Sequence, residues 1–230
     1  MIEVIPGVYQ LHNRFVNLYL IVELEALTLI DAGIAGSAAK LVLRAIAQVN
    51  RRPEDLRRIL ITHADADHYG GANELRRATG ARVYASAQEA AAMVRGTMSR
   101  EFRGNALVRG LFSLFGRLMP MSPTPVDETL TPGQVLPILG GLNVVASPGH
   151  TPDHISFYAP AHRLLFAGDS LNAMGGKLRF VDGPVTWSYQ RGLQSVREQA
   201  ALGAEIIAAG HGPVIRGAAP FDALHAARAS

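Results

Sequence analysis

The apolar run Ile59-Leu60-Ile61 leads into the segment Thr62-His63-Ala64-Asp65-Ala66-Asp67-His68-Tyr69-Gly70-Gly71. Two histidines and two aspartates fall within six consecutive residues of this segment. Imidazole and carboxylate groups are the ligands that hold Zn²⁺, Fe or Mn²⁺ in proteins. A buried strand that ends in such a cluster brings several ligands to one point, and Gly70-Gly71 lets the backbone turn closely there. The pattern favours a metal site over a polar loop that caps a helix with Asp67.

Five motifs together resemble those of the metallo-β-lactamase fold superfamily. The segment His63-Ala64-Asp65-Ala66-Asp67-His68 resembles its metal-binding signature, H-x-H-x-D-H. The other four also stand in the family's order: an early Asp-x-Gly turn at Asp31-Ala32-Gly33, a Gly-His-Thr-x-Gly-His segment at 149–154 with Asp153 in place of the second glycine, a Gly-Asp turn at Gly168-Asp169, and a terminal Gly-His-Gly-Pro at 210–213. Because one fold hosts many chemistries, the resemblance is more specific for the fold and the metal site than for the substrate.

Strands and helices are expected to alternate in two comparable halves. Periodicity alone predicts an α/β or α+β fold. The resemblance implies a four-layer αββα sandwich of the metallo-β-lactamase type, formed as a single domain over residues 1–230. Strands are expected at 8–11, 17–22, 27–30, 56–62, 82–85, 134–136, 142–145, 155–158, 163–167 and 205–209. Helices are expected at 36–49, 72–78, 87–94, 107–119, 187–202 and 221–228.

Composition narrows the classes of protein to which the chain can belong. It has 230 residues, 48% of them hydrophobic, so a sizeable core is possible. It has no cysteine, which excludes disulfides and thiolate metal sites. The net charge is +3 and no run of Lys or Arg exceeds two, so we expect no nucleic acid partner. No leader pattern and no bilayer-spanning apolar stretch is visible, so we expect a cytoplasmic protein without membrane insertion.

Residues 95–125 differ from the rest of the chain, because arginines alternate there with a wide apolar helical face at 107–119. Prolines within 120–125 end the segment. Insertions at this point commonly shape the substrate pocket in the resembled superfamily. We therefore expect a helical lid or pocket wall, with Phe112 and Phe115 as candidate substrate contacts, or a contact in a homodimer. The two roles are compatible.

In the resembled superfamily, seven side chains hold two divalent metal ions, and all seven positions carry possible ligands here. They are His63, Asp65 and His150 for the first ion, Asp67, His68 and His211 for the second, and Asp169 as the bridge between both. Two neighbouring cations lower the pKa of a bridging water, and the resulting hydroxide attacks a carbonyl or phosphoryl centre. Asp67 and Asp169 are the expected catalytic proton acceptors.

Asp65 departs from the signature, which has histidine at this position. A carboxylate makes the first site harder and more anionic, and such a donor set also suits Fe or Mn²⁺. We expect two Zn²⁺ ions, and Fe or Mn²⁺ are the alternative because of Asp65. A further alternative is that Asp65 does not ligate, which would leave one weak site and one strong site.

Other side chains near the motifs are expected to support the ligands or to meet the substrate. Those expected to orient histidines, to form a turn or to lie behind the site are Asp31, Thr62, Thr151, His154 and Ser170. Three aromatic side chains are candidate substrate contacts, with core packing as the alternative: Tyr69, Trp187 and Tyr189.

The function favoured by these motifs is hydrolysis of an ester, thioester or lactone of a small, partly hydrophobic substrate. The chain resembles lactonases and glyoxalase II-like thioesterases of the superfamily. A non-haem iron or di-iron redox enzyme is an alternative, because di-iron members carry a carboxylate at the position of Asp65. A β-lactamase-like amide hydrolase is another. A nuclease would need a nucleic-acid clamp and a basic cleft, and a non-catalytic binding protein would not need seven potential ligands.

Overall fold

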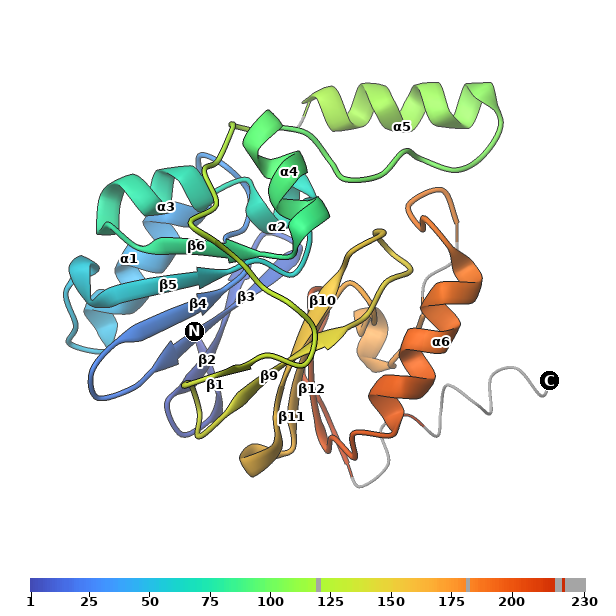
Figure 1. Cartoon of the computed structure of the whole chain (residues 1–230). Coiled ribbons are helices and arrows are strands. Elements are labelled where there is room, and N and C mark those ends of the chain that lie inside the picture. Colours follow the sequence, from blue (N-terminus) through green and yellow to red (C-terminus); the bar gives the residue numbers. More distant parts are fainter. Residues whose placement is uncertain (119–120, 181–182, 218–220, 222–230) are drawn as a thin grey trace. The chain divides into compact units, whose positions relative to one another are not determined.

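The computed structural model describes residues 1–118, 121–180, 183–217 and 221, without the side chains of 112, 113 and 115–118. The chain divides into two compact units (Figure 1). Unit 1 comprises Met1–Ser99 and Ser113–Leu130, and unit 2 comprises Arg100–Phe112 and Thr131–Ser230. Each unit holds one β-sheet. The single domain expected over 1–230 stays a prediction.

The sheet of unit 1 has its strands hydrogen-bonded in chain order. They are β1 (Ile2–Ile5), β2 (Val8–Asn13), β3 (Val16–Val22), β4 (Leu27–Ile30), β5 (Leu56–Leu60), β6 (Arg82–Ala85) and β7 (Glu128–Thr129). The first four form an antiparallel meander, and β4 to β7 are parallel. Because β4, β5 and β6 are parallel, the segments after their carboxyl ends leave the sheet at one edge.

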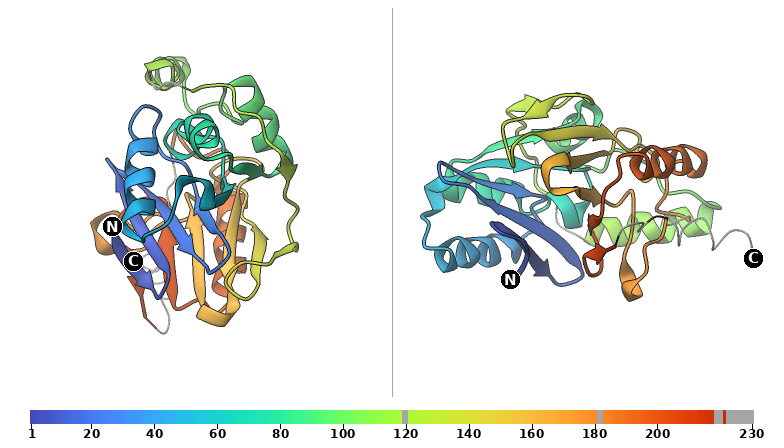
Figure 2. Two further views of the ribbon diagram at one scale, coloured as in Figure 1. Left: turned by 90° about the vertical axis from the view of Figure 1, so that its left-hand side faces the viewer. Right: turned by 90° about the horizontal axis from the view of Figure 1, so that it is seen from below.

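The helices of unit 1 connect its parallel strands. They are α1 (Ala38–Gln48), the short helix η1 (Pro53–Asp55), α2 (Ala66–Tyr69), α3 (Ala72–Thr79) and α4 (Ala87–Arg95). Ile46 of α1, Leu75 of α3 and Met93 of α4 belong to one buried apolar cluster with strand residues such as Leu29 and Val83. The apolar stripe of each helix therefore packs on the sheet. Figures 1 and 2 show α1 and α3 side by side against it.

The sheet of unit 2 has the strand order β13-β12-β11-β10-β9-β8. These strands are β8 (Val135–Leu136), β9 (Leu142–Ala146), β10 (Ile155–Ala159), β11 (Leu164–Gly168), β12 (Ile206–Ala209) and β13 (Ile215–Arg216). The pair β11 and β12 is parallel, and the other pairs are antiparallel. The carboxyl ends of β11 and β12 therefore lie at the same edge of this sheet.

Helix α6 (Tyr189–Ala200) runs along the sheet of unit 2 (Figure 1). Its Val196 packs in a buried cluster with Leu165 of β11 and Ile207 of β12. Ser188 caps the helix, since its side-chain oxygen accepts a hydrogen bond from the Arg191 N–H. Two short helices, η2 (Pro160–His162) and η3 (Met174–Gly176), lie in the connections.

The elements expected from the pattern within the described residues are present, and their ends differ by a few residues. Gly80, at φ 74°, ends α3 as expected. In the predicted insertion, α5 (Ala106–Leu118) crosses the boundary between the units. The helix expected at 221–228 lies outside the described residues, apart from Phe221. Among the residues that the structure describes, no helix combines the length and apolar character needed to cross a bilayer.

Candidate metal centre

Asp31 holds one of the ligand candidates of unit 1. It follows β4 in the left-handed backbone region, at φ 58°, and is 2% exposed. Its Oδ1 accepts a hydrogen bond from the Thr62 backbone N–H at 2.9 Å, and its Oδ2 accepts one from His68 Nδ1 at 2.8 Å. The carboxylate thus ties the end of β4 to the residue after β5 and orients His68, as the sequence predicts.

Thr62 extends this arrangement to the first histidine. Its hydroxyl oxygen lies 2.9 Å from Asp31 Oδ2 and 2.9 Å from His63 Nδ1. An ionised carboxylate can only accept, so the hydroxyl donates to Asp31 and accepts from the Nδ1–H of His63. His63 and His68 therefore carry their proton on Nδ1 and their lone pair on Nε2, the form in which a neutral imidazole ligates a metal. Their ring centroids are 4.1 Å apart.

Asp65 and Asp67 lie at the start of α2. Asp65 Oδ2 is 3.6 Å from His63 Nε2, and Asp67 Oδ2 is 3.9 Å from His68 Nε2. A helix does begin here, but its N-cap is Asp65, so the reading with Asp67 as the cap was wrong. The Asp65 side chain makes no capping hydrogen bond. Both carboxylates are near histidine nitrogens, which favours ligation over capping.

Glu89 on α4 contacts the ligand loop, and the sequence motifs did not predict this contact. It is fully buried, and its Oε2 accepts a hydrogen bond at 2.7 Å from the backbone N–H of Ala64, between His63 and Asp65. A buried carboxylate is costly unless it is bonded, so this contact anchors the ligand loop to α4. The available signal was an acidic residue beside Ala90 on a helix face that is otherwise apolar.

Unit 2 brings together three of the predicted ligands. Asp169 follows β11 and His211 follows β12, and these strands are parallel. Asp169 Oδ2 lies 3.1 Å from Nε2 of His211 and 3.7 Å from Nε2 of His150. These residues lie in loops that are far apart in the sequence. Asp169 and His211 come together because their loops follow parallel strands at the same edge of the sheet.

His154 lies behind these ligands, as expected. Its Nε2 accepts a hydrogen bond from the Asp169 backbone N–H at 3.1 Å, and its Nδ1 lies 2.7 Å from the Ser147 hydroxyl. Both ring nitrogens are thereby engaged, so His154 positions Asp169 rather than ligating. Gln199 of α6 donates to the hydroxyl of Ser170 at 2.7 Å, which fixes the turn after Asp169.

Gly149 lets the loop that carries His150 approach α6 closely. Its φ is 147°, and a Cβ added there would lie 2.3 Å from the Cα of Gly192. Only glycine fits such a position. The loop is also held by backbone hydrogen bonds from Trp187 to the carbonyl of His150 and from Ser188 to the carbonyl of Gly149.

The candidate substrate contacts lie in different environments. Tyr69 is fully buried in the core of unit 1 and donates to the carbonyl of Thr97, which is a packing position, and burial raises its pKa. Trp187 is 41% exposed. Tyr189 is half-buried, with its ring centroid 5.5 Å from that of Phe180. Phe112 and Phe115 fall on α5, but their side chains lie outside the described residues.

The donor set of each unit fits a divalent metal. Unit 1 offers Nε2 of two histidines with two carboxylates, and unit 2 offers Nε2 of two histidines beside Asp169. Imidazole with carboxylate suits Zn²⁺, Fe and Mn²⁺, and does not select Cu(I), which prefers sulfur. Hydrogen bonds fix the tautomer of His63 and His68 before any metal binds.

Several known proteins are similar to this chain in sequence. One is the uncharacterised protein YobT of Bacillus subtilis (strain 168), 29% identical over 212 residues, which cover 87% of this chain and 84% of YobT. Another is a hydroxyacylglutathione hydrolase of Cereibacter sphaeroides, 34% identical over 74% of this chain and 52% of the hydrolase. The chain thus spans about half the length of that hydrolase.

Solved structures and a family model agree with these relatives. A metallo-beta-lactamase family protein of Thermus thermophilus matches with a TM-score of 0.73 and 25% identity, over 99% of this chain and 80% of that one. A metallo-beta-lactamase of Cronobacter sakazakii matches with a TM-score of 0.71 and 26% identity, over 92% of this chain and 80% of that one. These matches confirm the predicted fold class. The family model of the metallo-beta-lactamase superfamily matches residues 13–211. The chain belongs to the metallo-beta-lactamase superfamily.

Proposed function

We propose that this protein is a metal-dependent hydrolase that cleaves an ester, thioester or lactone of a small, partly hydrophobic substrate. The observation that carries the proposal is the donor set, in which Asp31 and Thr62 turn the Nε2 lone pairs of two histidines outward beside carboxylates. The hydroxyacylglutathione hydrolase relatives support acyl transfer to water, since an acylglutathione is a thioester. A second relative is named a probable metallo-hydrolase.

The proposed centre is binuclear, with the ligands that the resemblance implies. His63, Asp65 and His150 would hold one ion, Asp67, His68 and His211 would hold the other, and Asp169 would contribute to both. Zn²⁺ is the proposed metal, with Fe or Mn²⁺ as the alternative because of Asp65. Bound divalent cations supply hydroxide at neutral pH and polarise the substrate carbonyl.

The chain's own residues supply orientation and proton transfer. Asp31 and Thr62 keep His68 and His63 in the ligating tautomer. His154 holds the backbone of Asp169. Asp67 and Asp169 would accept the proton of the attacking water, because an ionised carboxylate beside the nucleophile is a suitable general base.

A β-lactamase-like amide hydrolase is the second candidate function. Solved metallo-beta-lactamases, among them that of Cronobacter sakazakii, are similar to this chain. The ions that these residues would hold could polarise an amide carbonyl as well. The amine leaving group would need a proton donor. A small-molecule substrate, the absence of a nucleic acid partner, a homodimer and a cytoplasmic location stay predictions.

The first experiment is the metal content of protein purified without added metal. We expect about two equivalents of Zn²⁺ or Mn²⁺ per chain and metal-dependent hydrolysis of thioesters and lactones. His63→Ala and Asp169→Asn should each lower both the metal content and the rate. His162→Ala is the control, since His162 lies on η2 outside the ligand motifs.

Each other result would count against a definite part of the proposal. Iron as the main metal, with oxygen-dependent turnover, would replace hydrolysis by redox chemistry. Protein that binds no metal after reconstitution would refute the mechanism, and turnover of β-lactams alone would select the amide hydrolase.

A further inference from the structure

Arg100 is a buried arginine on the segment between α4 and α5, and it is 8% exposed. Its Nε donates to the carbonyl oxygens of His150 and Val185, both at 2.9 Å. The ring of Phe102 lies 5.4 Å from the centre of the guanidinium group. These contacts fix the plane of the guanidinium within unit 2. From the sequence alone, Arg100 has no predicted role beyond that of one of the arginines in the insertion at 95–125.

The guanidinium also contacts a ligand candidate. Arg100 Nη2 lies 3.1 Å from Nε2 of His150. A guanidinium nitrogen can only donate, so His150 Nε2 accepts with the one lone pair of an unprotonated ring nitrogen. The same Nε2 lies 3.7 Å from Asp169 Oδ2, on the side of the proposed bridge. One lone pair cannot serve a guanidinium proton and a metal ion together.

Binding of a metal by His150 Nε2 therefore requires Arg100 Nη2 to release it. The Nε hydrogen bonds to the carbonyls of His150 and Val185 do not involve that lone pair, so they keep the guanidinium beside the centre. A metal ion on His150 and the guanidinium of Arg100 would both be positive and would repel each other, and an anion between them would offset the repulsion. A guanidinium binds a carboxylate with two parallel hydrogen bonds, which makes a carboxylate the matching anion.

We propose that Arg100 determines substrate specificity: it holds His150 Nε2 in the metal-free protein and binds a carboxylate of the substrate once the metal is bound. The substrate class is then an acyl ester or thioester that carries a carboxylate near the bond to be cleaved. This inference rests on the proposed function, because it requires a metal ion at His150.

The first test measures metal affinity and needs no turnover. Metal-free wild type, Arg100→Gln and Arg103→Gln are titrated with Zn²⁺ against a chromophoric chelator. Arg100→Gln should bind the first-site ion about tenfold more tightly, because the competing charged hydrogen bond is lost. Arg103→Gln is the matched control, since Arg103 bonds the carbonyl of Thr186 and lies on the same segment. Equal affinity in all three proteins would overturn the competition for His150.

The second test compares two thioesters whose acyl chains end in a carboxylate or in its methyl ester. Zinc-loaded wild type and Arg103→Gln should prefer the carboxylate. Arg100→Gln should lose that preference by about tenfold, through KM rather than kcat. If Arg100→Gln does not fold, Arg100→Lys carries the test, because it keeps the charge and loses the planar geometry, so it should retain part of the preference.

The outcomes separate the two proposals. An unchanged substrate ratio in Arg100→Gln would overturn the specificity role while hydrolysis stands. Zinc-loaded wild type that cleaves neither thioester would count against the proposed function, and the zinc titration would still decide whether Arg100 competes for His150.

Discussion

Asp31 and His154 have parallel roles in the two units, because each orients a candidate ligand through a hydrogen bond. Asp31 accepts a hydrogen bond from the Nδ1–H of His68, and His154 accepts one from the backbone N–H of Asp169. Glu89 does the same for the loop between His63 and Asp65. Such outer partners set ring orientation and ligand basicity, so metal affinity depends on them nearly as much as on the ligands.

Replacement of Asp31 by asparagine should weaken metal binding by about 10- to 100-fold. Asparagine keeps the size and tolerates the left-handed backbone at this position, where φ is 58°. It removes the charge that holds the Nδ1 proton of His68. Zinc titration of Asp31→Asn checks this, with Asp55→Asn as control because Asp55 pairs with Arg51 outside the ligand motifs. Wild-type affinity in Asp31→Asn would contradict it.

The ligand candidates could be predicted from the sequence because their motifs are local and compact. The supporting residues could be predicted only in part. Asp31 and His154 stand inside family motifs, whereas Glu89 reaches Ala64 across 25 residues and Arg100 reaches His150 across 50. Such partners are brought together by the packing of helices and loops, which no spacing rule in the sequence records.

At the level of elements, parallel strand pairs explain where the motifs lie. Asp31 and Thr62 follow β4 and β5, and Asp169 and His211 follow β11 and β12. Alternation of strands and helices predicted these elements well. The start of α2 was harder to predict. Asp65 is the N-cap of this helix, but its side chain makes no capping hydrogen bond.

Helix α5 exposes three leucines at helical spacing, Leu107, Leu111 and Leu114. Such a stripe supports the proposed homodimer contact. If it forms that contact, Leu111→Glu should give a monomer in sedimentation at concentrations where wild type is a dimer. Arg109→Glu is the matched control, because residue 109 points away from this stripe on a helix. Identical masses for wild type and Leu111→Glu would contradict the dimer role.

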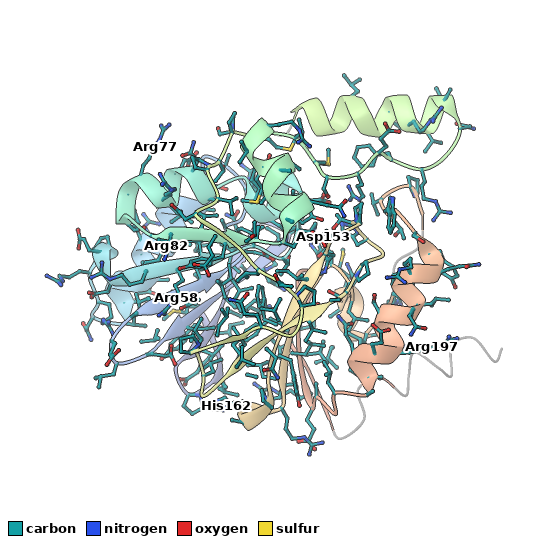
Figure 3. The ribbon with its side chains drawn as sticks, in the orientation of Figure 1. Arg58, Arg77, Arg82, Asp153, His162 and Arg197 are labelled. Carbon is teal, nitrogen blue, oxygen red and sulfur yellow. The ribbon has the colours of Figure 1, made fainter. Side chains whose placement is uncertain are left out.

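At the level of the molecule, each unit has its own sheet and its own helices. In unit 1, a charged contact joins the residue before β7 to α3 and β6. Asp127 accepts hydrogen bonds from Arg76 of α3 at 3.2 Å and from the Val83 N–H of β6 at 2.9 Å. Burial alone would raise the pKa of Asp127, but these two hydrogen bonds and the charges of Arg76 and Arg82 outweigh it and lower the pKa. Arg82 of β6, labelled in Figure 3, forms an ion pair with Glu128, and both side chains of this pair are exposed.

The pH dependence of unfolding should follow from Asp127. A lowered pKa in the folded state stabilises the protein above the pKa of the unfolded chain, near 3.8, and this contribution is lost as the pH falls below it. Asp127→Asn should therefore cost about 1 kcal/mol at pH 7 and much less at pH 3. Urea unfolding at both values tests this, with Glu128→Gln as the control. A loss that is equal at both values would contradict the assignment.

The contact between Gly149 and Gly192 bears on how new specificities can be engineered into this protein. Because a Cβ on Gly149 would lie 2.3 Å from Gly192 Cα, Gly149 cannot be varied in a mutant library without displacing the His150 loop or α6. A Cβ on Gly192 would meet the ring of Phe180, so this position is restricted as well. Trp187, by contrast, is exposed, and its backbone N–H donates to the carbonyl of His150. A library directed at Trp187 would change the surface presented beside the ligand loop while the backbone that holds His150 stays the same.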